Sequence, residues 1–458
     1  MKKTKVLCTI GPASLDERVL RLMYEAGMNG ARINTAFEDI PHYRNVIAKV
    51  RRICDIPVLF DLKGPELRVH TTKPLVLKEG DTLTVGEGED VSFNHPVYNQ
   101  LRTGDRVLFD DAKIESEVSG SEDGRLSLQV RVGGTLENGK GVNCPGRRLD
   151  VPTLSERDLT LIDFAKEQEV EVIALSFTRN ADDIRNLRKA IGDRESSIVA
   201  KIENEQSVDN FPQILDEADG IMVARGDLGI ELKPERVPLL QKRMIVACNQ
   251  LGKPVITATE MLESMTNNPN PTRAEVSDVA NAILDGTDTV MLSGETAIGK
   301  YPVESVAMMA RIAQETEEAV ASKVGGEEYR NISSAISWSV YQISRSMPLD
   351  KVVTITRTGY TAKAIARFRI KQPIIAVTRD LRVKRRLELV YGVYPVRIDY
   401  GDEEDKILSI ARALLSKGMV NAGDVVLFTA AFRTLQSHAS NLIEVHTVRE
   451  LMELEHGS

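Results

Sequence analysis

The sequence has few of the features that mark secreted, membrane-spanning or metal-cluster proteins. Only four of its 458 residues are cysteines, and they lie far apart, without the paired spacing of metal sites. We therefore expect buried or partly buried reduced thiols in a reducing, cytoplasmic environment. The six histidines also lack metal-ligand spacing, and the single tryptophan, Trp338, is expected to pack a helix in a core. The cysteines are Cys8, Cys54, Cys144 and Cys248.

Long hydrophobic runs and an excess of positive charge are also missing. No apolar run approaches the length of a membrane span, and the run after the N-terminal lysines is too short for a signal peptide. The 59 basic residues are mixed with 67 acidic ones, which gives a formal net charge of -8. This balance argues against nucleic acid and acidic membranes as partners and favours a small-molecule substrate.

The sequence does contain a regular alternation of strand and helix patterns. Eight short apolar runs are separated by segments such as LDERVLRLMYEAGM and ADDIRNLRKAIG, whose apolar residues recur at helical spacing. The runs are KVLCTI, GARIN, PVLFDLKG, VIALSF, SIVAKIE, GIMVARG, PVITATE and TVMLSGE. Eight such units predict an α/β fold of the (β/α)8 TIM-barrel type.

Two regions depart from this rhythm and predict further domains. Residues 68–152, after the third strand, contain alternating strand patterns and little helix, which indicates an inserted all-β domain placed as a lid over the barrel mouth. Residues 331–458 resume a strand and helix alternation and predict a C-terminal α/β domain. The barrel then comprises residues 1–67 and 153–330, and the chain is long enough for several domains.

One cation and two acids stand at the ends of neighbouring predicted strands. Lys201 and Glu203 are two residues apart in SIVAKIEN, so their side chains share a face, and Asp227 follows in GIMVARGDLG. TIM barrels hold their reacting groups at such strand ends. Magnesium prefers one or two carboxylates with water and phosphate, and a lysine can neutralise charge on a transferred phosphoryl group. The three residues therefore predict a phosphotransferase.

A second motif, TRTGYT, follows the first strand of the C-terminal domain. Its backbone N–H groups and threonine hydroxyls, at the start of a helix, can hold the phosphate of an effector. The residues concerned are Thr356, Thr358, Gly359 and Thr361. An ordinary glycine turn with a threonine cap explains the same residues equally well.

Long motifs extend over nearly the whole chain. They include TKVLCTIGPAS, GMNGARIN, DLKGPELR, GVNCPG, IALSFTR, AKIEN, GIMVARGDLGIE, GKPVITATEMLESM and NPTRAEVSDVANAILDGTDTVMLSGETA. By these motifs the chain resembles the pyruvate kinase family, more weakly in its C-terminal part. The resemblance implies transfer of phosphate from phosphoenolpyruvate to ADP, giving ATP and pyruvate in glycolysis, by a cytoplasmic homotetramer.

The resemblance also implies roles for single residues. Lys201 corresponds to the lysine that stabilises the migrating phosphoryl group, and Glu203 and Asp227 correspond to the ligands of Mg²⁺ or Mn²⁺. Arg32 and Thr259 are implied to act with Lys201 in catalysis. The implied substrate-binding residues are Arg32, Gly226, Asp227 and Thr259, and the implied nucleotide-binding residues are Asn34, Arg68 and Arg157.

The chain departs from the family pattern in the loop after Arg32. Where the family usually reads NFSHG, this chain reads Asn34, Thr35, Ala36, Phe37 and Glu38, so the serine hydroxyl that helps bind K⁺ is missing. The loss of one oxygen weakens a hard-cation site. The remaining implied K⁺ ligands are Asn34, Asp61 and the carbonyl group of Leu62, and Glu66 keeps the acid that the family associates with K⁺ dependence. We predict weak or absent K⁺ activation.

Three further departures are expected to alter the rate. Ala112 replaces a glycine of the lid, Gln206 and Ser207 replace a glutamate and a glycine, and Glu260 replaces a glutamine. The extra carboxylate of Glu260 could repel an anionic substrate unless it pairs with a cation or faces a subunit contact. Such changes leave open a divergent phosphotransferase with another donor or acceptor, or a weakly catalytic metabolite-sensing paralogue.

Each assigned side chain also has a purely structural interpretation. Lys201 and Glu203 could form a salt bridge inside the barrel, and Asp227 could cap a turn. The Thr259 hydroxyl could bond only to the backbone, and Arg32 and Arg68 could be surface ion-pair partners.

Overall fold

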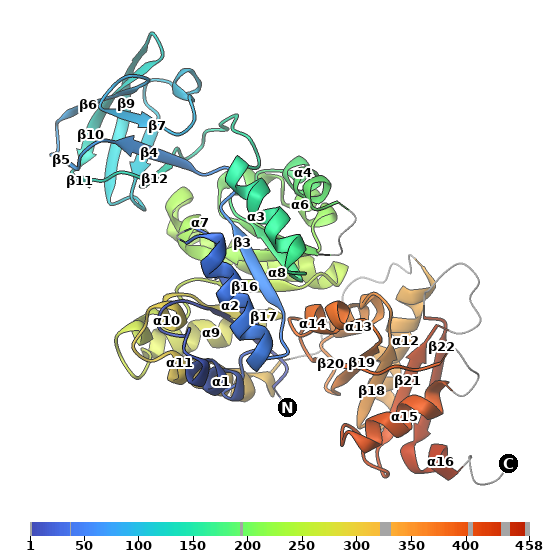
Figure 1. Ribbon diagram of the computed structural model, residues 1–458. Helices are drawn as coiled ribbons and strands as arrows, with labels where there is room; N and C mark the ends of the chain where they lie inside the picture. Colours follow the sequence, from blue (N-terminus) through green and yellow to red (C-terminus); the bar gives the residue numbers. More distant parts are fainter. Residues whose placement is uncertain are drawn as a thin grey trace.

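The chain forms a barrel, an inserted β unit and a C-terminal α/β unit in the computed structural model (Figure 1). The structure describes residues 2–36, 38–192, 196–320, 331–401, 406–431 and 440–453. Phe37, one of the departures in the predicted K⁺ loop, lies outside the described residues. No helix within these ranges is long and apolar enough to cross a membrane.

Eight parallel strands close into a barrel, and each of the eight predicted runs forms one of them. The strands are β1 (Lys5–Thr9), β2 (Gly30–Asn34), β3 (Val58–Leu62), β13 (Val172–Leu175), β14 (Ser197–Ile202), β15 (Gly220–Ala224), β16 (Val255–Ala258) and β17 (Thr289–Leu292). Their apolar residues are buried on both faces, because alternate side chains fill the barrel interior or pack against the surrounding helices. The predicted TIM barrel is confirmed.

Amphipathic helices surround these strands. They are α1 (Glu17–Glu25), α2 (Ile40–Ile53), α3 (Glu156–Glu167), α4 (Ala181–Ile191), α5 (Glu205–Asp209), α6 (Phe211–Glu217), α7 (Arg225–Glu231), α8 (Val237–Leu251), α9 (Arg273–Asp285), α10 (Gly294–Ala297) and α11 (Pro302–Glu317), with the 3₁₀ turns η2 (Pro234–Arg236) and η3 (Glu263–Thr266). Helix α9 shows why such segments begin and end where they do. Thr272 and Glu275 form a capping box at its start, and Gly286 ends it in a left-handed conformation.

The β-rich insertion follows β3 and stands at one end of the barrel (Figure 1). Its strands are β4 (Leu67–Thr71), β5 (Leu75–Leu77), β6 (Thr82–Gly86), β7 (Val91–Phe93), β8 (Arg106–Phe109), β9 (Ile114–Glu122), β10 (Arg125–Val132), β11 (Gly134–Leu136) and β12 (Gly141–Asn143), with the turn η1 (Tyr98–Gln100). Seven strands form one sheet in the order β6-β10-β9-β8-β12-β4-β7, and β5 pairs with β11. The unit buries its own apolar core, so the expected all-β insertion is confirmed.

The C-terminal unit is a five-stranded sheet with helices on both faces. Its elements are α12 (Ile332–Ser346), β18 (Lys351–Ile355), α13 (Tyr360–Ala366), β19 (Ile374–Thr378), α14 (Leu381–Leu387), β20 (Val393–Arg397), α15 (Lys406–Ser416), β21 (Val425–Ala430), β22 (Leu442–Thr447) and α16 (Val448–Glu453). The strand order β20-β19-β18-β21-β22 is parallel except for β22, which confirms the predicted α/β unit. Trp338 packs on Tyr341 and Phe368 but stays partly exposed.

The C-terminal unit closes the barrel at the N-terminal ends of its strands. Leu389 joins the apolar cluster inside the barrel, and a Cβ atom on Gly30 would lie 2.8 Å from the Leu389 side chain. Lys5 Nζ donates a hydrogen bond of 2.6 Å to the carbonyl oxygen of Val393. This end is therefore filled, and the opposite end, next to the insertion, is the one open to substrates. The proposed domain limits at residues 67, 152 and 330 remain predictions.

The four cysteines are buried and form no disulfide. The prediction of buried free thiols is confirmed. Burial raises the thiol pKa of Cys8, Cys144 and Cys248 well above its usual value, so these groups stay protonated and unreactive.

Candidate active site

Lys201, Glu203 and Asp227 meet at the open end of the barrel. Lys201 is near the end of β14 and Glu203 follows that strand directly. Asp227 lies in the first turn of α7, which begins immediately after β15. Because β14 and β15 are neighbouring parallel strands, their C-terminal ends share one edge of the barrel. The spacing rule thus placed these residues on the correct elements.

The Lys201 ammonium group is almost fully buried among acceptors. Its Nζ atom lies 2.8 Å from Glu203 Oε1 and 3.3 Å from Asp61 Oδ1, and it donates a hydrogen bond of 2.6 Å to Ser176 Oγ. Burial disfavours the charged form, but the Asp61 and Glu203 carboxylates outweigh it and raise the pKa of Lys201. Lys201 is therefore a fixed positive charge at neutral pH.

Burial destabilises the ionised form of the two acids near Lys201, which are Glu203 and Asp227. Glu203 is 0% exposed, and its Oε2 atom accepts a hydrogen bond of 2.6 Å from the backbone N–H of Phe177. Its Oε1 atom forms no hydrogen bond of good geometry with any described residue. Burial, opposed by Lys201 and reinforced by Asp227, raises the pKa of Glu203 to about 7, and burial also raises the pKa of Asp227.

Glu203 and Asp227 resemble a cation site that lacks some of its ligands. No group of three or more His, Cys, Asp or Glu side chains within the described part of the chain is arranged to hold a metal alone. Two carboxylates, one with a buried oxygen that faces only Lys201, still match Mg²⁺, which takes one or two protein carboxylates and completes its shell with water and phosphate oxygens. Glu203 and Asp227 therefore fit a divalent ion that is shared with a phosphorylated substrate.

Arg32 and Asp61 extend the charged cluster toward β2 and β3. Arg32 Nη2 lies 2.7 Å from Asp61 Oδ2, and Arg32 Nη1 donates a hydrogen bond of 2.9 Å to Thr9 Oγ1. Asp61 is 2% exposed, and Lys201 and Arg32 together overcome the effect of burial and lower its pKa. Arg32 is thus an ion-pair partner inside the barrel mouth, and its remaining donors can face a bound anion.

Gly226 and Thr259 form the neighbouring wall of the site. The backbone N–H of Gly226 donates a hydrogen bond of 2.8 Å to Thr259 Oγ1, which itself donates one of 2.6 Å to the Ala258 carbonyl oxygen. Thr259 has φ of +67°, a left-handed conformation that a threonine rarely adopts. The hydroxyl does bond to the backbone, and the same contact holds the Gly226–Asp227 segment against the end of β16.

Comparisons with known proteins agree with this geometry. The sequence pattern described as "Pyruvate kinase, barrel domain" matches residues 1–306, and the one described as "Pyruvate kinase, alpha/beta domain" matches residues 334–446. The chain belongs to the pyruvate kinase family. Among its curated relatives, "Pyruvate kinase" of Geobacillus stearothermophilus is 42% identical and "Pyruvate kinase" of Sporosarcina psychrophila is 40% identical, each over 100% of this chain and 82% of the relative. "Pyruvate kinase" of Clostridium acetobutylicum is 37% identical over 98% of this chain and 100% of the relative.

Membership of the pyruvate kinase family makes this chain a phosphotransferase. The family uses phosphoenolpyruvate and ADP as substrates and depends in general on a divalent metal ion and on K⁺. The resemblance found in the sequence is therefore confirmed over both the barrel and the C-terminal unit.

The loop that pyruvate kinases use for K⁺ is held here by protein groups. Asn34 Oδ1 accepts a hydrogen bond of 3.1 Å from the backbone N–H of Ala36, whose side chain offers no oxygen. Both Asp61 oxygens are engaged by Arg32 and Lys201. The Leu62 carbonyl accepts the backbone N–H of Ser176 at 3.1 Å. This donor set fits a monovalent ion poorly.

The predicted nucleotide contacts Arg68 and Arg157 are each engaged by neighbouring protein groups. Arg68 Nη2 lies 2.8 Å from Glu66 Oε2 in the insertion. Arg157 Nη2 donates to the carbonyl oxygens of Thr35, at 3.2 Å, and Glu38, at 2.7 Å. Neither arginine lines the cleft of about 250 Å³ between the insertion and the barrel, whereas Glu66 and Asp227 do. Their role in nucleotide binding remains a prediction.

Glu260 does not face the substrate pocket. Its side chain is exposed and lines a groove of about 540 Å³ on the outside of the barrel, together with Arg225 and Lys242. Arg225 connects the two regions, because its guanidinium donates to the carbonyl oxygen of Thr259 at 2.7 Å and pairs with Asp278 at 2.6 Å. The expected repulsion of an anionic substrate by Glu260 therefore has no geometric support.

Ala112, which replaces the family's glycine, lies in a left-handed stretch of backbone in the insertion. Asp110, Asp111 and Ala112 have φ of +51°, +57° and +61°, and Asp111 lines the cleft beside Asp227. Left-handed backbone costs an L-residue roughly 1–2 kcal/mol relative to glycine, although glycine loses more entropy on folding. Ala112→Gly is expected to raise the free energy of unfolding by about 0.5 kcal/mol. Urea unfolding should show this as a shift of the midpoint to higher urea concentration.

Asp123 offers a matched control for that measurement. It has φ of +49° in the turn between β9 and β10, away from the cleft. Aspartate tolerates this conformation better than alanine, so Asp123→Gly should have a smaller effect. A lower stability of Ala112→Gly than of the native chain would contradict the assigned strain.

The TRTGYT segment forms a glycine turn in the structure. Thr356 Oγ1 accepts a hydrogen bond of 2.9 Å from the backbone N–H of Gly359, which has φ of +85°. Thr361 Oγ1 and Ser440 Oγ are 2.8 Å apart, and Thr358 is exposed. These contacts match the alternative of an ordinary capped turn. Effector binding at this segment remains a prediction.

Ser176 and Phe177 are site residues that the sequence reasoning did not single out. They hold the Lys201 ammonium and the Glu203 carboxylate, respectively. Both directly follow β13, whose strand end lies next to that of β14. The strand-end rule that selected Lys201 would also have found them had it been applied to the run VIALSF.

Proposed function

We propose that Lys201, Glu203 and Asp227 form the catalytic centre with which this chain transfers the phosphoryl group of phosphoenolpyruvate to ADP. The observation that supports this assignment is the buried Lys201 ammonium 2.8 Å from Glu203 Oε1, with Asp227 after the neighbouring strand. A salt bridge that served stability alone would balance its charges. Here the two cations Lys201 and Arg32 face three carboxylates, those of Asp61, Glu203 and Asp227. The arrangement therefore favours the binding of a cation and an anion from solution.

Lys201 and Arg32 bind and neutralise the migrating phosphoryl group in this proposal. Phosphoryl transfer needs positioning and charge stabilisation more than covalent help from a side chain. Lys201 is rigidly oriented by Ser176 and Asp61, so it meets developing negative charge without reorganising. The Gly226 backbone and Thr259 border the same pocket and orient the substrate.

Glu203 and Asp227 would hold Mg²⁺ or Mn²⁺. A bound divalent ion supplies Lewis acidity to phosphate oxygens and offsets their charge. Burial raises the pKa of both acids, and the Asp227 carboxylate raises that of Glu203 further. The test is an assay of pyruvate formation from phosphoenolpyruvate and ADP, with Mg²⁺ and with the metal chelated. Turnover that survives chelation, or that needs another donor or acceptor, would reject this assignment.

Potassium is expected to activate this chain weakly or not at all. Ala36 lacks the oxygen of the family's serine, and Asp61 is already neutralised by two cations of the protein. Arg157 also donates to two carbonyl groups of the same loop. We expect less than about a threefold difference in kcat between K⁺ and a bulky organic cation at equal ionic strength, because the site lacks one of its few oxygen ligands. A large response to K⁺ would contradict this prediction.

A cytoplasmic homotetramer is the assembly that we propose. Large apolar side chains on the outer face of α8 support self-association, since Leu239 is 61% exposed and Val246 is 43% exposed. Sedimentation velocity is expected to show a tetramer. Leu239→Lys should weaken it, whereas a stable monomer of the native chain would reject the proposal.

A further inference from the structure

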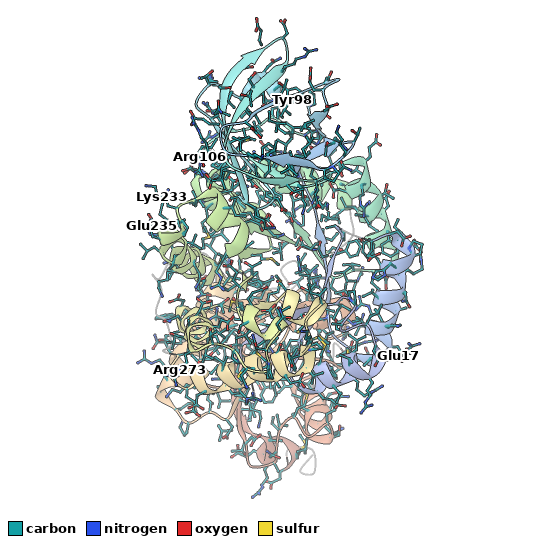
Figure 2. All side chains as sticks on the ribbon, turned by 90° about the vertical axis from the view of Figure 1, so that its left-hand side faces the viewer. Glu17, Tyr98, Arg106, Lys233, Glu235 and Arg273 are labelled. Atoms are coloured by element: carbon teal, nitrogen blue, oxygen red, sulfur yellow. The ribbon has the colours of Figure 1, made fainter. Side chains whose placement is uncertain are left out.

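Arg225 is a buried cation beside the active site that the proposed transfer does not use. It is the first residue of α7, directly after β15, and its side chain is 9% exposed. It also lines the outer groove of about 540 Å³ that α7, α8 and α9 border. Lys233 and Glu235, which follow α7, and Arg273, at the start of α9, lie along one side of the barrel in Figure 2. Arg225 thus stands between this outer side and the barrel mouth.

The Arg225 guanidinium binds the turn that follows β16. Its Nε and Nη2 atoms donate hydrogen bonds of 3.2 Å and 2.7 Å to the carbonyl oxygen of Thr259. Nη2 also lies 3.1 Å from the Glu260 carbonyl oxygen and 2.9 Å from Met261 Sδ. One planar fork of donors therefore contacts three consecutive residues, a geometry that a lysine ammonium cannot reproduce.

The turn needs such contacts because its backbone is strained. Thr259 has φ of +67° and Glu260 has φ of +53°, so two consecutive L-residues adopt the left-handed conformation. For a β-branched threonine this conformation is an outlier, and it persists only where the surrounding groups enforce it. Removal of Arg225 would take two donors from the Thr259 carbonyl group and allow the turn to relax.

The same turn places the Thr259 hydroxyl in the wall of the active site. Thr259 Oγ1 accepts a hydrogen bond of 2.8 Å from the backbone N–H of Gly226, which lies between Arg225 and Asp227 in the chain. The Arg225 side chain thus holds the carbonyl group of Thr259, while the next backbone N–H holds its hydroxyl. A displacement of about 1 Å in a group that orients a substrate can lower a rate about 10²-fold.

The ion pair of Arg225 with Asp278 does not explain the buried guanidinium. Arg225 Nη1 lies 2.6 Å from Asp278 Oδ2 on α9, but the Asp278 side chain is 40% exposed. An ion pair that is open to solvent contributes little to stability. The contacts with the strained turn are therefore the larger part of what Arg225 does.

We propose that Arg225 is a positioning residue for phosphoryl transfer, which holds the left-handed turn at Thr259 and so places the Thr259 hydroxyl against the Gly226–Asp227 segment. The proposal rests on the proposed function, because it takes Thr259 and Asp227 as groups of the active site. Glu260 takes part through its carbonyl oxygen, so its exposed side chain can differ from the glutamine of the family without loss of this contact.

Hydrogen exchange followed by mass spectrometry tests the positioning on the full-length protein without any substrate. In Arg225→Met, peptides that contain Gly226 and residues 259–261 are expected to exchange about tenfold faster or more, because the turn opens more often. The amides of β16 should stay protected. Lys242→Met removes another cation of the outer groove and should leave the exchange at the native rate. Native exchange of the turn in Arg225→Met would overturn the proposal.

Steady-state kinetics test the consequence for the reaction. The kcat of Arg225→Met per folded molecule is expected to fall about tenfold or more, with a smaller rise in KM for phosphoenolpyruvate. Arg225→Lys keeps the charge opposite Asp278 but should recover little of the loss, and it carries the same tests if Arg225→Met does not fold. Asp278→Asn should stay within about twofold of the native kcat. Full recovery in Arg225→Lys would overturn the proposal.

A double variant separates this proposal from the proposed function. If Arg225 acts through Thr259, the losses of kcat in Arg225→Met and Thr259→Ala should not multiply when the two are combined. Losses that multiply would overturn the proposal. A slow Thr259→Ala together with a native kcat in Arg225→Met would reject the proposal alone. A native kcat in Thr259→Ala would reject Thr259 as a residue of the active site, and the proposal with it.

Discussion

Replacing Lys201 by methionine is expected to lower kcat by at least 10²–10³-fold, the usual effect of removing one preorganised charge donor from an active site. The methionine keeps most of the side-chain volume and removes the ammonium that lies between Glu203, Asp61 and Ser176. Since the lysine acts on charge that develops during transfer, kcat should fall much more than substrate affinity. Arg32 remains to bind the substrate phosphate.

The fold should survive this substitution. Lys201→Met leaves buried carboxylates with one fewer positive charge, but Glu203 already has a pKa raised to about 7 and can take up a proton. The matched control is Lys417→Met, which removes an exposed lysine far from the site. Steady-state kinetics and equilibrium dialysis with phosphoenolpyruvate separate turnover from binding. A variant within tenfold of native kcat would remove Lys201 from the mechanism.

Lys201→Arg gives a sharper form of the same experiment. It restores the charge but not the compact ammonium that contacts three acceptors at once. If position as well as charge matters, Lys201→Arg should recover only a small part of the lost turnover. Full recovery would show that the field of a positive charge alone is sufficient.

The barrel and its reacting residues were predictable because they depend on local patterns. Seven of the eight strands are buried at nearly every position, and their apolar composition marks them as parallel strands, while β2 is partly exposed at Arg32 and Asn34. Once the strands are parallel, their ends share one rim, and Lys201, Glu203 and Asp227 are placed there by sequence position only. No knowledge of side-chain contacts was needed for that step.

The partners of these residues were less predictable because they come from distant segments. Asp61 reaches Lys201 only because β3 pairs with β13 across the whole β-rich insertion. The hydrogen bonds of Arg157 to the loop after β2 similarly join residues more than one hundred positions apart. A motif can suggest that an arginine binds nucleotide, but whether it is already engaged depends on tertiary structure.

The junction between the barrel and the C-terminal unit had no sequence signal at all. Leu389 follows an amphipathic helix and resembles any core leucine, yet it fills the barrel end. Arg369 resembles a surface cation, yet it is 2% exposed. These groups become buried only when the two units dock. The sequence pattern of each unit is complete without the other and does not reveal the contact.

Arg369→Met is expected to lower the free energy of unfolding by about 3–5 kcal/mol, the range for removing one partner of a buried ion pair. Arg369 Nη1 lies 2.9 Å from Asp288 Oδ1, and its guanidinium stacks 4.6 Å from the centre of the Tyr391 ring. Asp288 is only 3% exposed, so the variant leaves its charge buried. Urea unfolding followed by fluorescence of Trp338 measures the loss, which should appear first in the C-terminal unit.

The companion variant Asp288→Asn distinguishes the pair from simple packing. Asp288 also accepts backbone N–H groups of Val255, at 3.0 Å, and Tyr391, at 3.1 Å, and an asparagine oxygen can keep only part of these bonds. If the ion pair is the source of stability, Arg369→Met with Asp288→Asn should be less destabilised than the sum of the two single variants. Strict additivity would show that Arg369 acts through its packing against Tyr391 or its hydrogen bonds to Asn249 and Gly286, and not through its pair with Asp288. Because both residues lie at the filled end of the barrel, kcat per folded molecule should stay close to native, in contrast to Lys201→Met.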